Sequence, residues 1–156
     1  LLRAFARLKE KAELHLVGPL EADFALDLAK LPLDNVVIGG AVSGDVLMNT
    51  YANADVFCLP SLEEGFGMVA LEAMASELPV VISDAAGAAD VVTPGNDGLI
   101  FASGDESALA AALDALVGDP KKRRVMGAAA RQRVLTGYRW DDYVDRAVTA
   151  YERLLA

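Results

Sequence analysis

The sequence has few of the side chains that metal and redox sites depend on. Its 156 residues include one cysteine, Cys58, and one histidine, His15. A single cysteine excludes an internal disulfide and any metal site with several cysteine ligands, and it is typical of a protein in a reducing, cytoplasmic compartment. Both residues lie in apolar, strand-like runs, so we interpret Cys58 as a buried, inert thiol and His15 as a structural or surface residue. No apolar run approaches the ~18 residues that a membrane-spanning helix needs.

Positive charge is also scarce. Lys and Arg together number 14 against 23 Asp and Glu, which gives a net charge of −9 at pH 7. This balance argues against a nucleic acid partner, because binding phosphates along a strand needs a basic face. It also argues against docking on anionic lipid through charge alone. The basic run at residues 121–124 is interpreted as a solvated helix face, with peripheral membrane contact in a longer enzyme as the alternative.

Apolar residues are plentiful, at 54% of the chain, and suffice for one hydrophobic core. We therefore expect a single domain over residues 1–156. The sequence begins inside a helical pattern and without Met. We accordingly expect a domain truncated at its N-terminus and taken from a longer protein.

Strand-like and helix-like segments alternate along the first two thirds of the chain. Short apolar runs rich in β-branched residues predict strands at residues 14–19, 36–40, 56–60, 79–83 and 98–101. Helical periodicity predicts helices over residues 1–8, 21–30, 45–54, 67–76, 106–118, 120–136 and 140–155. The alternation predicts an α/β, Rossmann-like parallel sheet flanked by helices, with strands covered on both faces and a helical C-terminal third. Within that last third, Asp119 is expected to cap the helix that starts at Pro120, and Trp140 and Tyr151 are expected to be packing anchors.

The most informative stretch follows the third predicted strand and reads S-L-E-E-G-F-G-M-V-A-L-E-A-M-A over residues 61–75. Open α/β sheets bind ligands beyond the carboxyl ends of their strands. Gly65 and Gly67 allow the backbone to come close to a ligand there. A helix that begins near Gly67 leaves its first N–H groups without partners inside the helix. Together with the helix dipole, these groups suit a phosphate.

Glu72 is the only charged side chain between Gly65 and Ser76. A carboxylate on an otherwise apolar helix is costly unless it is paired or faces a polar cleft. With Glu64 on the preceding loop, two carboxylates would border one crevice with backbone amides between them, which fits a nucleotide sugar. Two simpler interpretations stay open: a favourable interaction with the helix dipole, or an ion pair with a Lys or Arg elsewhere.

These residues also resemble a known family. E-G-F-G-x-x-x-x-E at residues 64–72 is similar to the E-x7-E motif of retaining GT-B glycosyltransferases in glycosyltransferase family 4, the glycosyl transferases group 1. Y-A-N-A-D-V followed by P-S (residues 51–61), E-A-M-A followed by P-V-V (residues 72–81) and N-D-G-L (residues 96–99) resemble further motifs of that family. The resemblance extends over nearly the whole chain.

The resemblance implies the C-terminal, donor-binding domain of a two-domain enzyme that transfers a sugar from a nucleoside-diphosphate sugar to an acceptor hydroxyl. Glu64 would be the catalytic residue that meets the sugar hydroxyls, and Glu72 would take the ribose hydroxyls. The implied donor-binding residues are Gly39, Gly40, Ala41, Gly65, Phe66, Gly67, Met68, Val69 and Glu72, with the base near the first three. The family requires no metal or further cofactor. The implied partner is an N-terminal acceptor-binding domain, absent here, so we expect the isolated chain to be inactive.

The sequence departs from the family pattern in three respects. The Arg and Lys that neutralise the diphosphate in the family belong before Leu1. The usual Gly before Leu78 is Glu77, and the family's Gly-Gly-x-x-Glu loop reads A-G-A-A-D at residues 86–90. Two alternatives therefore stay open: a stand-alone nucleotide-sugar-binding module, and a catalytically dead domain that serves assembly.

Overall fold

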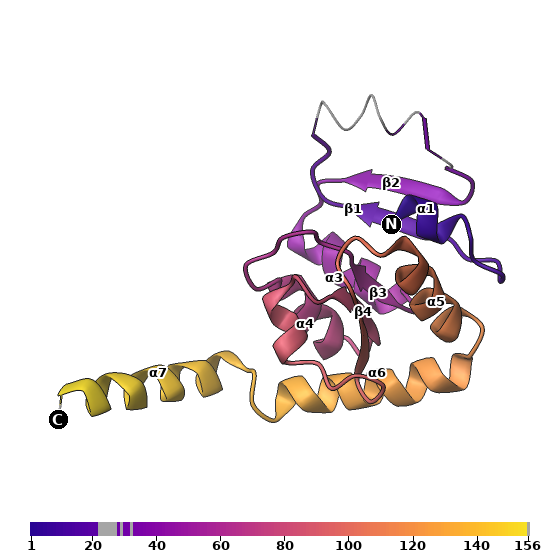
Figure 1. Ribbon diagram of the computed structural model, residues 1–156. Helices are drawn as coiled ribbons and strands as arrows, with labels where there is room; N and C mark the ends of the chain where they lie inside the picture. Colours follow the sequence, from indigo (N-terminus) through magenta and orange to yellow (C-terminus); the bar gives the residue numbers. More distant parts are fainter. Residues whose placement is uncertain (22–27, 29, 32, 156) are drawn as a thin grey trace.

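A computed structural model describes residues 1–21, 28, 30–31 and 33–155 of the chain (Figure 1). The helix predicted over residues 21–30 lies largely outside the described residues. The elements follow the predicted alternation: α1 (Leu2–Phe5), β1 (Leu14–Val17), β2 (Val36–Gly40), α3 (Gly44–Asn53), β3 (Phe57–Leu59), α4 (Met68–Ala75), β4 (Val80–Ser83), the 3-10 helix η1 (Gly87–Asp90), β5 (Gly98–Phe101), α5 (Glu106–Val117), α6 (Pro120–Leu135) and α7 (Trp140–Leu155).

All the strand pairs are parallel, which confirms the predicted α/β class. β1 pairs with β2, and β3, β4 and β5 pair in that order. The described strands thus fall into two parallel sheets rather than one. Within the described ranges, no backbone pairing joins one sheet to the other. The carboxyl ends of β3, β4 and β5 meet at one edge, because the three strands run in the same direction.

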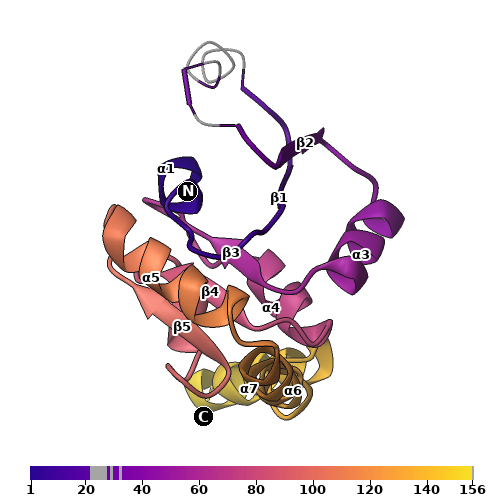
Figure 2. The same cartoon turned by 90° about the vertical axis from the view of Figure 1, so that its right-hand side faces the viewer.

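The core lies on both faces of β4. Its side chains alternate between the faces, as pleated strands require. Val80 and Ile82 join a cluster shared with α4 and α6, whereas Val81 joins a cluster shared with α1 and α5. Figure 2 shows α4 and α5 on either side of β4. Every residue of β4 is buried, so this strand is covered on both faces as predicted.

The prediction that both faces of every strand are covered is wrong for β1 and β2. In the pair they form, burial alternates along β1, and Val37 and Ile38 of β2 are 41% and 43% exposed. Apolar composition alone misled the prediction, because a β-branched residue fits a pleated strand whether or not a helix covers it. The strands that carry the core are therefore β3, β4 and β5.

The helical C-terminal third is confirmed, including its capping. The Asp119 carboxylate accepts a hydrogen bond from the backbone N–H of Lys122 at 2.9 Å, and Pro120 opens α6. One residue of the basic run at residues 121–124 makes hydrogen bonds within the fold. Arg123 donates to the carbonyls of Leu116 and Val117, at 2.9 and 2.7 Å, and so closes the end of α5.

The last helix is the exception to this packing. α7 buries none of its residues and extends away from the rest of the molecule (Figure 1). Trp140 and Tyr151 are 71% and 69% exposed, so the expectation that they anchor the helix by packing is wrong. The Trp140 ring instead makes an edge contact with Tyr143 in the same helix.

Glu77 occupies a backbone position that normally selects glycine. α4 ends in a Schellman motif, in which the Leu78 N–H donates to the carbonyl of Ala73 and the Glu77 N–H donates to the carbonyl of Met74. Glu77 therefore has φ +65°, in the left-handed region. The departure from glycine noted in the sequence thus lies at the C-terminal end of α4, the end away from Gly67.

We expect Glu77→Gly to raise the free energy of unfolding by about 0.5–1 kcal/mol. Relief of the left-handed strain is worth about 1–2 kcal/mol, and the extra chain entropy of glycine offsets part of it. The loss of the contact with Arg131 counts for little, because both side chains are about half exposed. Chemical denaturation gives the measurement. Glu77→Ala is the matched control, since it removes the same charge and keeps the strain; equal stability of the two variants would contradict the strain argument.

Candidate functional site

The carboxyl ends of the three core strands are connected by a small polar network. The Ser83 hydroxyl, at the end of β4, donates to the carbonyl of Ser61 at 2.6 Å. Ser103 follows β5, and its hydroxyl donates to the same carbonyl at 3.3 Å. The backbone N–H of Ser103 donates to the Asp84 carboxylate at 2.7 Å. The loop after β3 is therefore fixed to the ends of β4 and β5, at the edge where open α/β sheets bind ligands.

The candidate loop is joined to the loop after β4 by backbone contacts. The N–H of Glu64 donates to the carbonyl of Ala85 at 3.3 Å, and the N–H of Ala88 donates to the carbonyl of Phe66 at 2.7 Å. At Gly87 the two backbones come so close that a Cβ would lie 2.4 Å from the Gly65 carbonyl oxygen. Of the family's Gly-Gly pair, this chain thus keeps the glycine that the contact requires.

The start of α4 is open to a ligand. Gly67 precedes the helix with φ +85°, and no side chain caps the first turn. A Cβ at Gly67 would lie 2.8 Å from Leu59 Cδ2, so both conformation and space favour glycine. Phe66 and Met68 are 39% and 47% exposed beside this turn. The helix start therefore presents backbone N–H groups and partial positive charge at the carboxyl edge of the sheet.

Glu72 lies one turn into α4 and is exposed, whereas Ala70, Leu71, Ala73 and Met74 around it are buried. Its carboxylate accepts a hydrogen bond from the Tyr51 hydroxyl at 3.2 Å. No Lys or Arg of the described part of the chain forms an ion pair with it. Burial, reinforced by the charge of Glu72, raises the pKa of Tyr51 to about 12. Sequence reasoning missed this contact, because the two residues are 21 positions apart and on different helices.

The predicted site residues fall into two groups. Glu64, Gly65, Phe66, Gly67, Met68, Val69 and Glu72 form one continuous segment from the β3 loop into α4. Gly39, Gly40 and Ala41 lie at the end of β2, where the Gly40 carbonyl accepts from the N–H of Gly18 at 2.8 Å. Among the described residues no hydrogen bond or ion pair connects the second group to the first.

Other site types find little support. Over the ranges that the structure describes, no three His, Cys, Asp or Glu side chains gather closely enough to hold a metal ion. Burial raises the pKa of the Cys58 thiol to about 12, which agrees with an inert structural cysteine. None of the described helices is both long and apolar enough to cross a bilayer.

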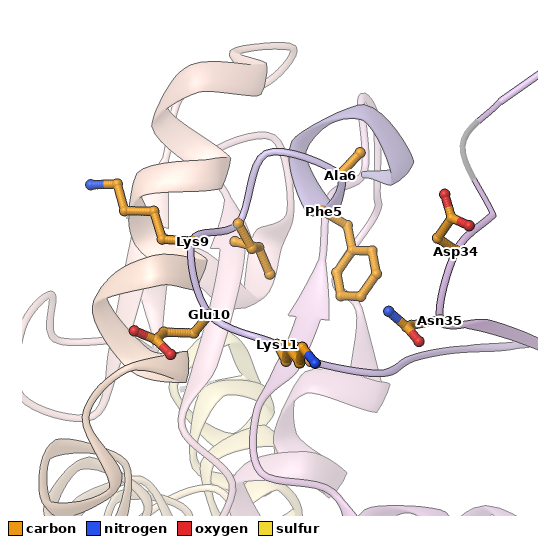
Figure 3. Close-up of a pocket in the computed structure, with 9 residues that line it drawn as sticks. Phe5, Ala6, Lys9, Glu10, Lys11, Asp34 and Asn35 are labelled. Atoms are coloured by element: carbon orange, nitrogen blue, oxygen red, sulfur yellow. The ribbon is translucent and has the colours of Figure 1, made fainter.

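A cavity of about 240 Å³ lies at the opposite end of β1 and β2 (Figure 3). It lies at the amino ends of these strands, and its charged lining mixes both signs in Lys9, Glu10, Lys11 and Asp34. Phe5 and Asn35 also border it. A larger cavity, of about 620 Å³, lies between α5 and the segment that follows α1. Neither is lined by a predicted site residue. The carboxyl-edge position and the open helix start make the segment from residues 64 to 72 the better candidate.

Comparison with known proteins identifies the family. Residues 1–133 match the model of the family "Glycosyl transferases group 1". An MMP α-(1→4)-mannosyltransferase of Mycolicibacterium hassiacum is 35% identical over 162 residues, which cover 100% of this chain and 39% of that protein. A sulfoquinovosyl transferase of Arabidopsis thaliana is 37% identical over 118 residues, 74% of this chain and 22% of that protein.

Solved structures agree. Sucrose-phosphate synthase from Thermosynechococcus elongatus superposes with a TM-score of 0.84 at 29% identity, over 99% of this chain and 41% of that one. The Anabaena protein HepE in complex with UDP-glucose superposes with a TM-score of 0.78 at 26% identity, over 86% of this chain and 39% of that one. The chain spans less than half the length of each of these proteins. By family match, sequence identity and fold, the chain belongs to the glycosyl transferases group 1 and has the α/β fold of GT-B glycosyltransferases.

Proposed function

We propose that this chain is the donor-binding part of a retaining glycosyltransferase and that it binds a nucleoside-diphosphate sugar along residues 64–72. The observation that carries the proposal is the uncapped start of α4, flanked by Glu64 and Glu72 at the carboxyl edge of the core strands. Backbone amides supply donors for a diphosphate, and carboxylates supply acceptors for hydroxyls. Supporting this, HepE of Anabaena, to which the chain is similar, was solved with UDP-glucose.

Each group has a distinct task in this proposal. The N–H groups and dipole at the start of α4 stabilise the charge that develops on the departing diphosphate. Glu64, whose backbone is bonded to the loop after β4, orients the sugar hydroxyls for transfer. Glu72 accepts from the ribose, and Gly39, Gly40 and Ala41 border the base. An acceptor-binding domain, which lies outside this chain, would supply the acceptor and exclude water from the donor.

The departures at Glu77 and at residues 86–90 do not favour the assembly-module alternative. Glu77 lies at the C-terminal end of α4, away from the site. Gly87 is kept where the backbone contact with Gly65 excludes any side chain. The stand-alone binding module shares the same site and differs in binding tightly without another domain.

The test is a titration of the chain with UDP, GDP and ADP, followed by backbone amide chemical shifts. We expect shifts at residues 65–72 and 39–41 with the nucleotide of the preferred base. Glu72→Gln is expected to weaken binding about 10-fold, since glutamine keeps an acceptor oxygen but loses the charge, and a charged hydrogen bond exceeds a neutral one by about 1–1.5 kcal/mol. Glu63→Gln is the matched control: it removes the same charge from an exposed neighbour outside the site and should leave the affinity unchanged.

Two results would contradict the proposal. Absence of shifts with all three nucleotides, in a chain with an intact amide spectrum, would contradict a donor site that this chain forms by itself. Shifts confined to the cavity near Phe5 and Asn35 would place the ligand at the other end of the strands. Micromolar or tighter binding by the isolated chain would favour the stand-alone module over the two-domain enzyme.

A further inference from the structure

We propose that Tyr51 is a positioning residue for Glu72, and that it sets the preference of the site for ligands with ribose hydroxyls. This inference rests on the proposed function. It starts from one contact between two helices: the Tyr51 hydroxyl on α3 donates to Glu72 Oε2 on α4, at 3.2 Å. The hydroxyl thus reaches from the core to a carboxylate at the candidate site.

The Tyr51 ring is held in place by its surroundings. The residue is only 4% exposed and belongs to the core cluster that also contains Ala70 and Met74 of α4. Its ring makes an edge contact with Phe57 of β3, with centroids 6.0 Å apart and planes at 72°. A ring fixed by strand and helix holds its hydroxyl oxygen in one place, and that place is 3.2 Å from Glu72 Oε2.

The contact orients Glu72 without neutralising it. No cation of the described chain pairs with this carboxylate. A Lys or Arg paired with Glu72 would compete with a ligand for the negative charge of the carboxylate. The Tyr51 phenol instead donates to Oε2 and leaves Oε1 to accept from a ligand hydroxyl. Because the pKa of Tyr51 is raised to about 12, the phenol remains a donor throughout the neutral range. The exposed glutamate is thereby held on the side of α4 that faces Tyr51 of α3.

The consequence is a defined selectivity. A carboxylate fixed to accept from ribose hydroxyls should discriminate against a ligand that lacks them. A carboxylate free to rotate adapts to solvent instead and loses part of that discrimination. Tyr51→Phe keeps the ring packing and removes only the hydroxyl. We expect it to reduce the preference for ribose over dideoxyribose by about 3- to 10-fold.

The experiment measures dissociation constants of UDP, GDP and ADP and of their 2′,3′-dideoxy counterparts for four proteins: the unaltered chain, Tyr51→Phe, Glu72→Gln and the double variant. In the Glu72→Gln background, Tyr51→Phe should change the ribose preference no further, since the positioned group is gone. Tyr138→Phe is the matched control: Tyr138 packs against the same cluster, and its hydroxyl makes no contact with Glu72.

The outcomes separate the two ideas. If the unaltered chain binds no nucleotide, the proposed function and this inference both fail. If it binds with a ribose preference that Tyr51→Phe leaves unchanged, the proposed function stands and the positioning role is overturned. A purely structural role for the hydroxyl predicts equal losses for ribose and dideoxyribose ligands, and that result also overturns the inference.

Discussion

Gly127→Ala should lower the free energy of unfolding by about 2 kcal/mol. Gly127 lies in α6, where the helix crosses the end of α4, and an added Cβ would lie 2.0 Å from the carbonyl oxygen of Glu77. It would also lie 3.4 Å from Pro79 Cδ. We expect a cost of about 3 kcal/mol, the upper end of the usual range for overpacking, because the neighbouring group is backbone and cannot change rotamer. Alanine returns about 1 kcal/mol as the better helix former.

Urea denaturation at constant temperature measures this effect. Gly44→Ala is the matched control, because Gly44 also lies in a helix and its Cβ would meet nothing within 4 Å. The control should be neutral or slightly stabilising. If Gly127→Ala is as stable as the unaltered chain, α6 does not cross the end of α4 as closely as described.

Gly87→Ala should weaken nucleotide binding about 10-fold and destabilise the fold by about 1–3 kcal/mol. The added Cβ would lie 2.4 Å from the Gly65 carbonyl oxygen and 3.1 Å from Phe66 Cα. To make room, the loop before α4 must move away from the loop after β4. That movement displaces the amides that would hold the diphosphate, and displacements of about 1 Å can reduce transfer rates by 10²-fold.

Amide-shift titration gives the affinity, and denaturation gives the stability. Gly137→Ala serves as the control, since a Cβ there would meet nothing within 4 Å and the residue lies in the link before α7. It should change neither quantity. A Gly87→Ala protein that is destabilised yet binds normally would show that the Gly65 backbone is not part of the binding surface.

Local signals in the sequence predicted the elements well. β5 and α7 have the bounds that their patterns indicated, and Asp119 with Pro120 located the start of α6. Glu64 and Glu72 of the E-x7-E spacing lie in the loop after β3 and in α4, on the elements that the sequence predicted for them. These features depend on neighbours within a few residues, where turn chemistry, capping and periodicity act.

What the sequence did not predict depends on contacts between distant residues. The hydrogen bond from Tyr51 to Glu72 and the close approach of Gly87 to Gly65 both span more than 20 positions. Composition also does not show which apolar residues are buried: Ile38 and Trp140 are exposed, although both are residue types that suit a core. Such contacts follow from how strands and helices stack, and a local pattern does not encode that stacking.

The exposure of α7 has a thermodynamic consequence. A helix of 16 residues that buries no side chain receives little stabilisation from the core, and an isolated helix of that length is marginal in water. The order of residues 140–155 is therefore only weakly coupled to the cooperative transition of the domain. A denaturation midpoint would report on the three-stranded core and its helices alone, and the helix–coil equilibrium of α7 would proceed independently of it.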